Sequence, residues 1–115
     1  MKVELLYFNG CPGYETAEKT LKGVLADEGR EATVSRVAVN TDEEARRLRF
    51  PGSPTIRVDG RDLFPVPEQQ DWRLGCRVYA IPEGLRTSPT TEMLREALET
   101  RRDTYANRDS SRRPA

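Results

Sequence analysis

The residues best suited to chemistry are two cysteines, Cys11 and Cys76, in a chain of 115 residues that contains no histidine. Without histidine there is no imidazole base and no imidazole metal ligand, so thiols, carboxylates, tyrosines and arginines are left to do any chemistry. Two thiolates also fall short of the four ligands of a tetrahedral zinc site. We therefore expect thiol chemistry that uses no metal and no cofactor.

Cys11 lies between Gly10 and Pro12, after the apolar run at residues 3–8 and before an amphipathic pattern. Proline suits the first position of a helix, so the pattern places this thiol in the first turn of a helix. The unpaired N–H groups and the helix dipole favour a thiolate there. Cys11 is therefore the candidate nucleophile. The alternative is a small buried residue that fills space under the helix.

The elements around Cys11 have the pattern of a βαβ unit. Residues 3–8 are nearly all apolar, which is typical of a central strand buried on both faces. Residues 12–28 carry apolar side chains at helical spacing and are followed by Gly29, and residues 33–39 are rich in β-branched residues. A helix between two such strands predicts a parallel pair with a right-handed crossover.

A second helix is expected to begin at Thr41, which has capping-box spacing to Glu44, and to end before Phe50-Pro51. Residues 56–58 and 61–64 then flank Asp59-Gly60, which predicts an antiparallel hairpin with a type I′ turn. Three basic residues of the second helix and its exit form either a solvated face or a positive potential beside a thiolate: Arg46, Arg47 and Arg49.

Cys76 opens a further predicted strand, residues 76–81. The hairpin leaves and returns to the edge of the sheet where residues 3–8 end, so Cys76 is expected near Cys11. It then resolves an oxidised Cys11 through an intramolecular disulfide, which needs Cα atoms within about 7 Å. The alternative is a structural cysteine that faces inward with Val78 and Ala80.

The rest of the chain indicates one domain with a short tail. Ser88 is a predicted N-cap and Pro89 the first residue of a last helix, with residues 103–115 a polar, disordered tail to a domain at residues 1–102. Nineteen basic and nineteen acidic residues cancel, which argues against nucleic-acid binding through bulk charge. No membrane span or signal peptide is visible, so we expect a cytoplasmic protein.

Two motifs resemble the thioredoxin-like family over residues 1–100: Gly10-Cys11-Pro12-Gly13-Tyr14 and Gly52-Ser53-Pro54-Thr55. The resemblance implies an α/β fold with a central mixed sheet of four to five strands and a cis peptide bond at Ser53-Pro54. It also implies that the Ser53 backbone, with Pro54, Gly10, Pro12 and Tyr14, binds an extended partner or substrate. The chain departs from the family where Tyr14 replaces the second cysteine of Cys-x-x-Cys. Tyr14 therefore either assists a thiolate or packs in the core.

The same motifs are similar to a subgroup of small bacterial thioredoxin-like proteins in which selenocysteine can replace the residue matching Cys11. That likeness implies a redox nucleophile at this position. The favoured hypothesis is a protein that reduces a protein or small-molecule disulfide, or a peroxide, and is recycled by a partner thiol. A binding module with inert cysteines is the second hypothesis. A soft-metal carrier or organomercurial lyase, by a loose likeness, is the third. The oligomeric state stays open.

Overall fold

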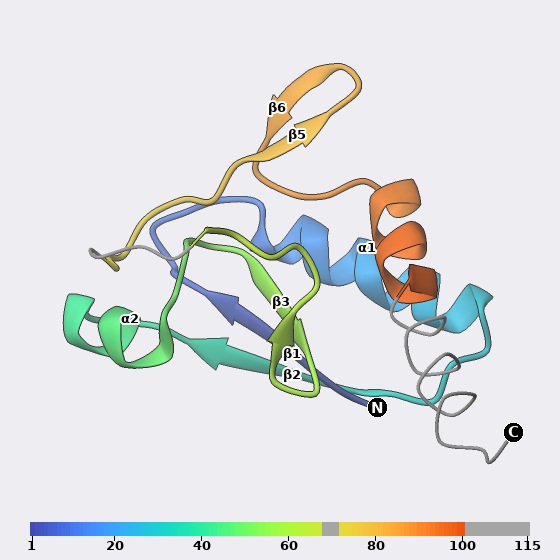
Figure 1. The fold of residues 1–115 in the computed structure, drawn as a ribbon, viewed down its shortest axis with the longest axis horizontal. Coiled ribbons are helices and arrows are strands. Elements are labelled where there is room, and N and C mark those ends of the chain that lie inside the picture. Colours follow the sequence, from blue (N-terminus) through green and yellow to red (C-terminus); the bar gives the residue numbers. More distant parts are fainter. Residues whose placement is uncertain (68–71, 101–115) are drawn as a thin grey trace, which may run out of the picture.

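The fold is organised around a four-stranded mixed sheet with the strand order β2-β1-β3-β4 (Figure 1). The computed structural model describes residues 1–67 and 72–100. The sheet strands are β1 (Lys2–Tyr7), β2 (Thr33–Ala38), β3 (Thr55–Val58) and β4 (Arg61–Asp62). β1 pairs in parallel with β2 and antiparallel with β3, and β3 pairs antiparallel with β4. The apolar first strand is thus internal, as its sequence predicted.

The chain forms the helices α1 (Tyr14–Asp27) and α2 (Asp42–Leu48) in the predicted order, and residues 91–100 are also helical. α1 connects the parallel strands β1 and β2. The Thr41 hydroxyl accepts a 3.0 Å hydrogen bond from the Glu44 N–H, which confirms the predicted N-cap of α2. Among the described residues, no helix is long and apolar enough to cross a membrane.

Two clusters contain the buried apolar side chains of the sheet. The larger joins residues of β1, α1, β3 and helix 91–100, including Leu5, Leu21 and Leu98. The smaller joins Leu6 to α2 through Ala45. Consecutive residues of a strand point to opposite faces, so Leu5 and Leu6 lie on opposite faces of the sheet. The helices α1 and 91–100 therefore cover the face of Leu5, and α2 covers the face of Leu6. Figure 1 shows α1 and helix 91–100 next to each other.

The predicted hairpin of β3 and β4 is confirmed, and its turn has the expected conformation. Both turn residues have positive φ angles, 51° at Asp59 and 84° at Gly60, as a type I′ turn requires. β4 ends at Asp62, earlier than the predicted residues 61–64, because the Asp62 carboxylate accepts a hydrogen bond from the Phe64 N–H. This local side-chain bond turns the chain out of the strand.

The predicted start of the first helix is wrong by two residues. α1 begins at Tyr14 with Gly13 as its N-cap, so Pro12 is not its first residue and Cys11 is not in its first turn. Gly13 has φ 107°, and a Cβ on it would lie 2.4 Å from the Thr87 hydroxyl oxygen. A left-handed glycine pressed against Thr87 therefore sets the start of the helix.

The single strand predicted at residues 76–81 is also wrong. β5 (Tyr79–Ile81) pairs instead with β6 (Gly84–Arg86) in a separate two-stranded hairpin, and Cys76 forms an isolated parallel bridge with Ser53. The residues between the strands, Pro82-Glu83, make a tight turn that sequence analysis missed.

The last helix begins later than predicted. Residues 91–100 are helical, and the Thr90 hydroxyl accepts a 3.1 Å hydrogen bond from the Met93 N–H. Thr90 is therefore the N-cap in place of Ser88, and Pro89 is buried before the helix. The predicted tail at residues 103–115 lies outside the described residues.

Candidate functional site

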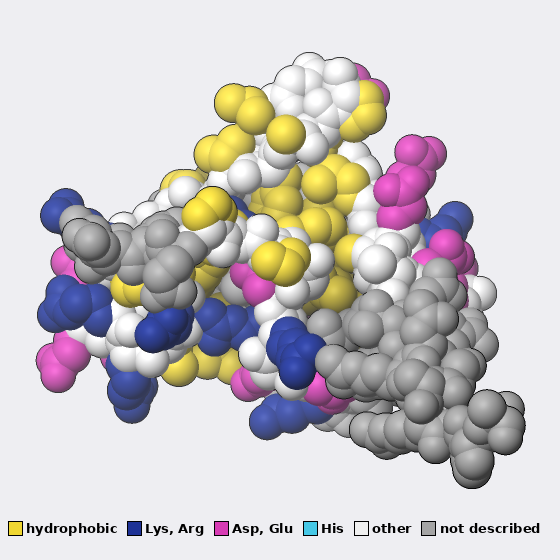
Figure 2. Space-filling view, viewed as in Figure 1, with side chains coloured by type: hydrophobic (Ala, Val, Ile, Leu, Met, Phe, Trp, Pro, Cys, Tyr) yellow, Lys and Arg dark blue, Asp and Glu magenta, His cyan; other side chains and the backbone are white. Residues whose placement is uncertain are grey.

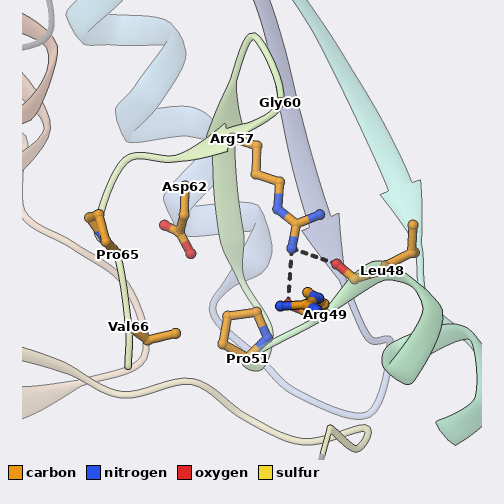
Figure 3. A pocket seen from close by; sticks show the side chains of 8 residues that line it. All are labelled: Leu48, Arg49, Pro51, Arg57, Gly60, Asp62, Pro65 and Val66. Atoms are coloured by element: carbon orange, nitrogen blue, oxygen red, sulfur yellow. Dashed lines mark hydrogen bonds between the residues drawn. The ribbon is translucent and has the colours of Figure 1, made fainter. Parts of the chain in front are cut away.

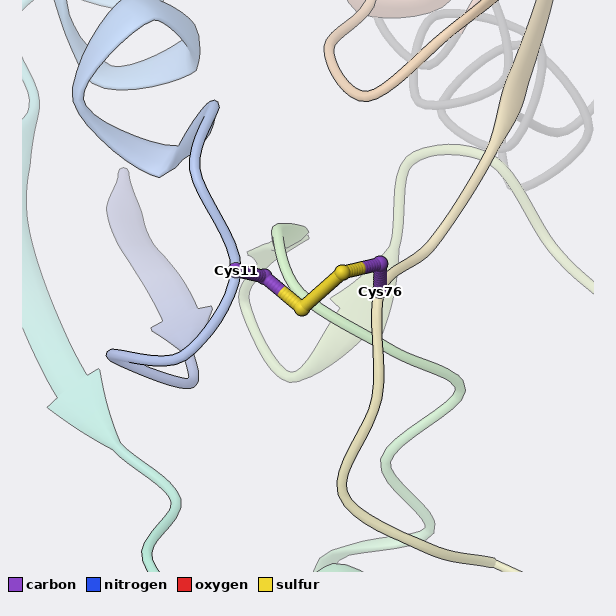
Figure 4. The surroundings of a disulfide bond; sticks show 2 residues. All are labelled: Cys11 and Cys76. Carbon is purple, nitrogen blue, oxygen red and sulfur yellow. A yellow bond between two sulfur atoms is a disulfide. The ribbon is translucent and has the colours of Figure 1, made fainter.

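Cys11 and Cys76 are joined by a disulfide bond, with their Cα atoms 5.5 Å apart (Figure 4). The two residues are 65 positions apart in the sequence. The predicted proximity of Cys76 to Cys11 is therefore confirmed. Cys11 comes from the turn between β1 and α1, and Cys76 comes from the segment that precedes β5 (Figure 4).

A tight turn holds Cys11 below the surface. Its N–H donates a 3.1 Å hydrogen bond to the Phe8 carbonyl oxygen, and its residue exposure is only 2%. Gly10 permits this turn, because a Cβ there would lie 2.5 Å from the Phe8 ring. Pro12 follows as an exposed turn residue. The thiol predicted to be the nucleophile thus belongs to the buried residue of the disulfide pair.

The loop that contains Pro54 binds the segment around Cys76. The Ser53-Pro54 peptide bond is cis, as expected. The Ser53 N–H donates to the Gly75 carbonyl oxygen, the Ser53 carbonyl oxygen accepts from the Arg77 N–H, and both bonds measure 2.8 Å. The Ser53 backbone, which the resemblance assigned to an external partner, is therefore occupied by the chain's own residues.

Gly52 allows this close approach of two chain segments. Its φ is 131°, and a Cβ on it would lie 2.8 Å from the Arg77 backbone nitrogen and 2.9 Å from the Arg77 Cα. Residues with a side chain rarely adopt that φ. The atoms that the Cβ would meet belong to the Arg77 backbone, so they could move away only with the rest of that segment. Gly52 is thus required both by its conformation and by its contact with Arg77.

Arg77 anchors the Cys76 segment from inside the protein and was missed by sequence analysis. Its side chain is 6% exposed, and its guanidinium donates to the Asp62 carboxylate at 2.8 Å, to the Thr55 hydroxyl at 3.3 Å and to the Phe64 carbonyl oxygen. These three acceptors compensate for the burial of the charge.

The Cys76 segment alternates between buried and exposed residues. Arg77 and Tyr79 are buried, whereas Cys76, Val78 and Ala80 are exposed. The alternative of an inward-facing Cys76 is therefore wrong. A charged residue is seldom buried, and no pattern in the segment signals that Arg77 finds three buried acceptors.

Tyr79 links the same segment to the Pro54 loop. Its hydroxyl donates a 2.6 Å hydrogen bond to the Pro54 carbonyl oxygen, and its ring meets Phe64 edge-on at 5.4 Å between centroids. Burial raises the pKa of the Tyr79 phenol well above its usual range, although the nearby Arg77 guanidinium opposes the shift. Tyr79 therefore stays protonated and acts as a donor across the neutral pH range.

The contacts of Tyr14 define a surface stack. The Tyr14 ring stacks on Tyr7 at 4.6 Å between centroids, the Arg36 guanidinium lies 5.5 Å from its centroid, and its hydroxyl donates to the Asn9 side chain at 3.4 Å. Partial burial, followed by the Glu15 carboxylate, raises the pKa of Tyr14. Tyr14 is half-buried and belongs to neither apolar cluster, so the predicted core packing is not observed. Assistance to a thiolate stays a prediction.

The predicted basic residues lie at the end of α2. Arg46 and Arg47 occupy its last turn, where cations suit the helix dipole, and Arg49 is its C-cap with φ 52°. Arg49 and Arg57 line a surface depression of about 300 Å³ whose lining includes neither cysteine (Figure 3). Arg57 donates there to the Leu48 and Arg49 carbonyl oxygens at 2.7 and 3.0 Å. A role for these arginines beside a thiolate stays a prediction.

Two further features complete the surroundings of the disulfide. The Ser53 hydroxyl is fully buried and makes no hydrogen bond with the described residues. Hydrophobic side chains lie on the surface around the β5–β6 hairpin (Figure 2): Leu85 of β6 is 67% exposed, and Val78, which precedes β5, is 55% exposed. Within the described residues, no group of three or more cysteine or acidic residues is arranged to hold a metal ion.

Comparison of the chain with known proteins found no matching family model, no matching curated protein and no matching solved structure.

Proposed function

We propose that the chain is a thiol–disulfide redox protein that cycles between the Cys11–Cys76 disulfide and the dithiol. The observation that carries the proposal is the pairing of two distant cysteines with a Cα separation of 5.5 Å. Oxidation of the dithiol releases two electrons and two protons to a disulfide or a peroxide, and a partner dithiol or two partner thiols, which become a disulfide, restore the dithiol.

Backbone contacts independent of the disulfide support reversible cycling. The turn at Cys11 has its own hydrogen bond to Phe8, and the Cys76 segment has two hydrogen bonds to Ser53. These bonds do not need the sulfur–sulfur bond, so we expect the two thiols to stay adjacent after reduction. Closure of the disulfide is then intramolecular and fast.

The competing function for the pair is a structural crosslink. In the chain-entropy model, closing a loop of this length stabilises a fold by about 4 kcal/mol. A structural disulfide has a reduction potential below about −300 mV, whereas redox-active pairs lie roughly between −120 and −270 mV. The reduction potential therefore separates the two functions.

The test is equilibration of the protein in a series of thiol–disulfide buffers, followed by acid quenching and intact mass measurement. We expect a midpoint above about −300 mV, where redox-active pairs are found. The Cys76→Ser variant is the matched control, because it keeps Cys11 and cannot lose two protons by ring closure. A midpoint well below that value shows that the disulfide is a structural crosslink and overturns the proposal.

The second and third hypotheses stay predictions. A binding module that grips an extended segment through the Ser53 backbone first has to displace residues 75–77, which occupy both Ser53 backbone groups. Soft-metal binding needs the two sulfurs as thiolates, and organomercurial cleavage also needs a carboxylic acid that donates a proton beside them. Neither has an observation in its favour comparable with the paired cysteines.

A further inference from the structure

We propose that Cys76, and not Cys11, is the cysteine that forms the mixed disulfide with a thiol partner. The inference rests on the proposed redox function and assigns opposite roles to the two sulfurs. The sequence pattern predicted that Cys11 attacks and Cys76 resolves. The structure supports the reverse order through burial, backbone occupancy and the direction of the Cys76 peptide groups.

Burial of Cys11 is the first argument. A thiolate attacks a disulfide by approaching one sulfur along the sulfur–sulfur axis, so the attacked sulfur has to be accessible. Cys11 is 2% exposed, whereas Cys76 is an exposed residue. The residue exposures therefore favour attack on the Cys76 sulfur, with the Cys11 sulfur as the leaving group.

Occupancy of the Pro54 loop is the second argument. A partner that pairs with the Ser53 backbone would be placed against Cys11, but Gly75 and Arg77 already make both hydrogen bonds to Ser53. Arg77 is held in turn by its buried pair with Asp62. The partner therefore meets the segment of residues 75–77 from its outer side.

The backbone of Cys76 faces that outer side. In a parallel bridge, the residue opposite Ser53 directs its own N–H and C=O away from Ser53, because its two neighbours supply the hydrogen bonds. Within residues 1–67 and 72–100, neither Cys76 group has a backbone partner. An extended cysteine-containing segment of a partner protein can pair there and bring its sulfur to Cys76.

The reaction then balances in two exchange steps. The Cys76 thiolate attacks a partner disulfide, a bond forms between Cys76 Sγ and one partner sulfur, and the other partner sulfur leaves with the electron pair and takes up a proton. The Cys11 thiolate next attacks Cys76 Sγ, which releases the second partner thiolate and forms the Cys11–Cys76 disulfide. Two electrons have passed from the protein to the partner, and a partner dithiol reverses both steps.

The test compares two single-cysteine variants, Cys11→Ser and Cys76→Ser, in their reaction with oxidised glutathione near neutral pH. Each rate is divided by the rate of the same variant unfolded in guanidinium, which removes intrinsic differences between the sequences. We expect the normalised rate of Cys11→Ser, in which Cys76 reacts, to exceed that of Cys76→Ser by about tenfold or more. Equal rates, or a faster Cys76→Ser, overturn the proposal.

A second measurement uses the oxidised wild type and does not depend on the folding of either variant. The protein is mixed with excess reduced glutathione, quenched in acid to stop exchange, and digested with pepsin for mass mapping. We expect the glutathione adduct on the Cys76 peptide, and an adduct mainly on the Cys11 peptide overturns the assignment. A very low reduction potential with the adduct on Cys76 would overturn the redox function alone, so the two failures are distinguishable.

Discussion

The Arg77 N–H donates a 2.8 Å hydrogen bond to the Ser53 carbonyl oxygen, and this bond places Cys76 beside Cys11. The bond joins a segment that precedes a small hairpin to a loop that enters β3. The same arginine sends its side chain inward to Asp62. One residue thus fixes the candidate site through its backbone and through its buried charge.

Replacement of Gly52 by alanine should destabilise the fold and make the Cys11–Cys76 disulfide easier to reduce. The new Cβ would lie 2.8 Å from the Arg77 nitrogen, and φ 131° is unfavourable for alanine. We expect the variant to lose about 1–3 kcal/mol of unfolding free energy. We also expect a less negative reduction potential, by about 30 mV for each tenfold decrease in the equilibrium constant for disulfide formation. Both quantities are measured by urea denaturation and redox titration.

Gly75→Ala is the matched control, because it lies in the same bridged segment and, apart from its two chain neighbours, no described residue has an atom within 4 Å of the added Cβ. We expect its unfolding free energy and its potential to stay near the wild-type values. If Gly52→Ala also leaves both values unchanged, the contact between Gly52 and Arg77 does not set the position of Cys76.

Replacement of Arg77 by methionine should destabilise the fold and weaken disulfide closure together. Methionine fills much of the space but leaves the Asp62 carboxylate, whose side chain is 16% exposed, without its cation. Losing one partner of a buried ion pair costs about 3–5 kcal/mol, and the partial exposure of Asp62 lowers our expectation to roughly 2–4 kcal/mol. Denaturant unfolding of the oxidised and reduced proteins measures both effects.

The control for Arg77 is Arg36→Met, which removes a bidentate partner of Glu18 from a site where the arginine side chain is 45% exposed. An exposed pair contributes little, so we expect a much smaller loss of stability than at Arg77. A loss at Arg77 no larger than that at Arg36 would show that the buried pair does not hold the segment. The conservative variant Arg77→Lys should retain only part of the wild-type stability, because lysine lacks the planar fork of donors.

Removal of the Ser53 hydroxyl should be nearly neutral although the residue is fully buried. The hydroxyl has no partner among the described residues, so alanine gives up no hydrogen bond and relieves a desolvated polar group. The matched comparison is Thr55→Val, which removes a fully buried hydroxyl that donates to the Gly52 carbonyl oxygen at 2.6 Å. We expect Thr55→Val to cost about 1–3 kcal/mol. A comparable loss in Ser53→Ala would mean that its hydroxyl is bonded in solution.

Replacement of Tyr79 by phenylalanine should change the alkaline limb of the stability curve. The folded protein keeps the Tyr79 proton to higher pH than the unfolded chain, because burial raises the pKa of the phenol. Above about pH 10 the unfolded chain ionises first, so the wild type loses stability as pH rises, by up to about 1.4 kcal/mol per pH unit from this group. The variant lacks this loss, and urea unfolding of the oxidised protein between about pH 8 and 11, on either side of the unfolded phenol's pKa, measures it.

At neutral pH the same variant should be less stable by about 1–3 kcal/mol, because the buried Pro54 carbonyl oxygen loses its 2.6 Å donor. Tyr14→Phe is the control, since the Tyr14 ring is half-buried and its hydroxyl makes only a 3.4 Å bond. Parallel alkaline slopes for wild type and Tyr79→Phe would contradict the assignment of the slope to Tyr79.

Local patterns in the sequence determined the central elements of the fold. The apolar run of β1, the helical spacing of α1, the Thr41 cap and the Asp59-Gly60 turn each depend on a few adjacent residues, so each could be predicted. The order of these elements also placed Cys76 near Cys11, because a hairpin returns the chain to the edge from which it left. Boundaries set by distant contacts, such as Gly13 against Thr87, were predicted wrongly.

Only the tertiary structure decided which cysteine is buried and which faces outward. The alternation of residues 76–80 permits either facing, and the alternative that placed Cys76 inward with Val78 and Ala80 is wrong. Arg77 reverses it, because Asp62, Thr55 and the Phe64 carbonyl oxygen meet its guanidinium inside the protein, and none of these acceptors is adjacent to it in sequence. The exposure of Cys76 therefore depends on long-range contacts of a neighbouring charge, which no local pattern encodes.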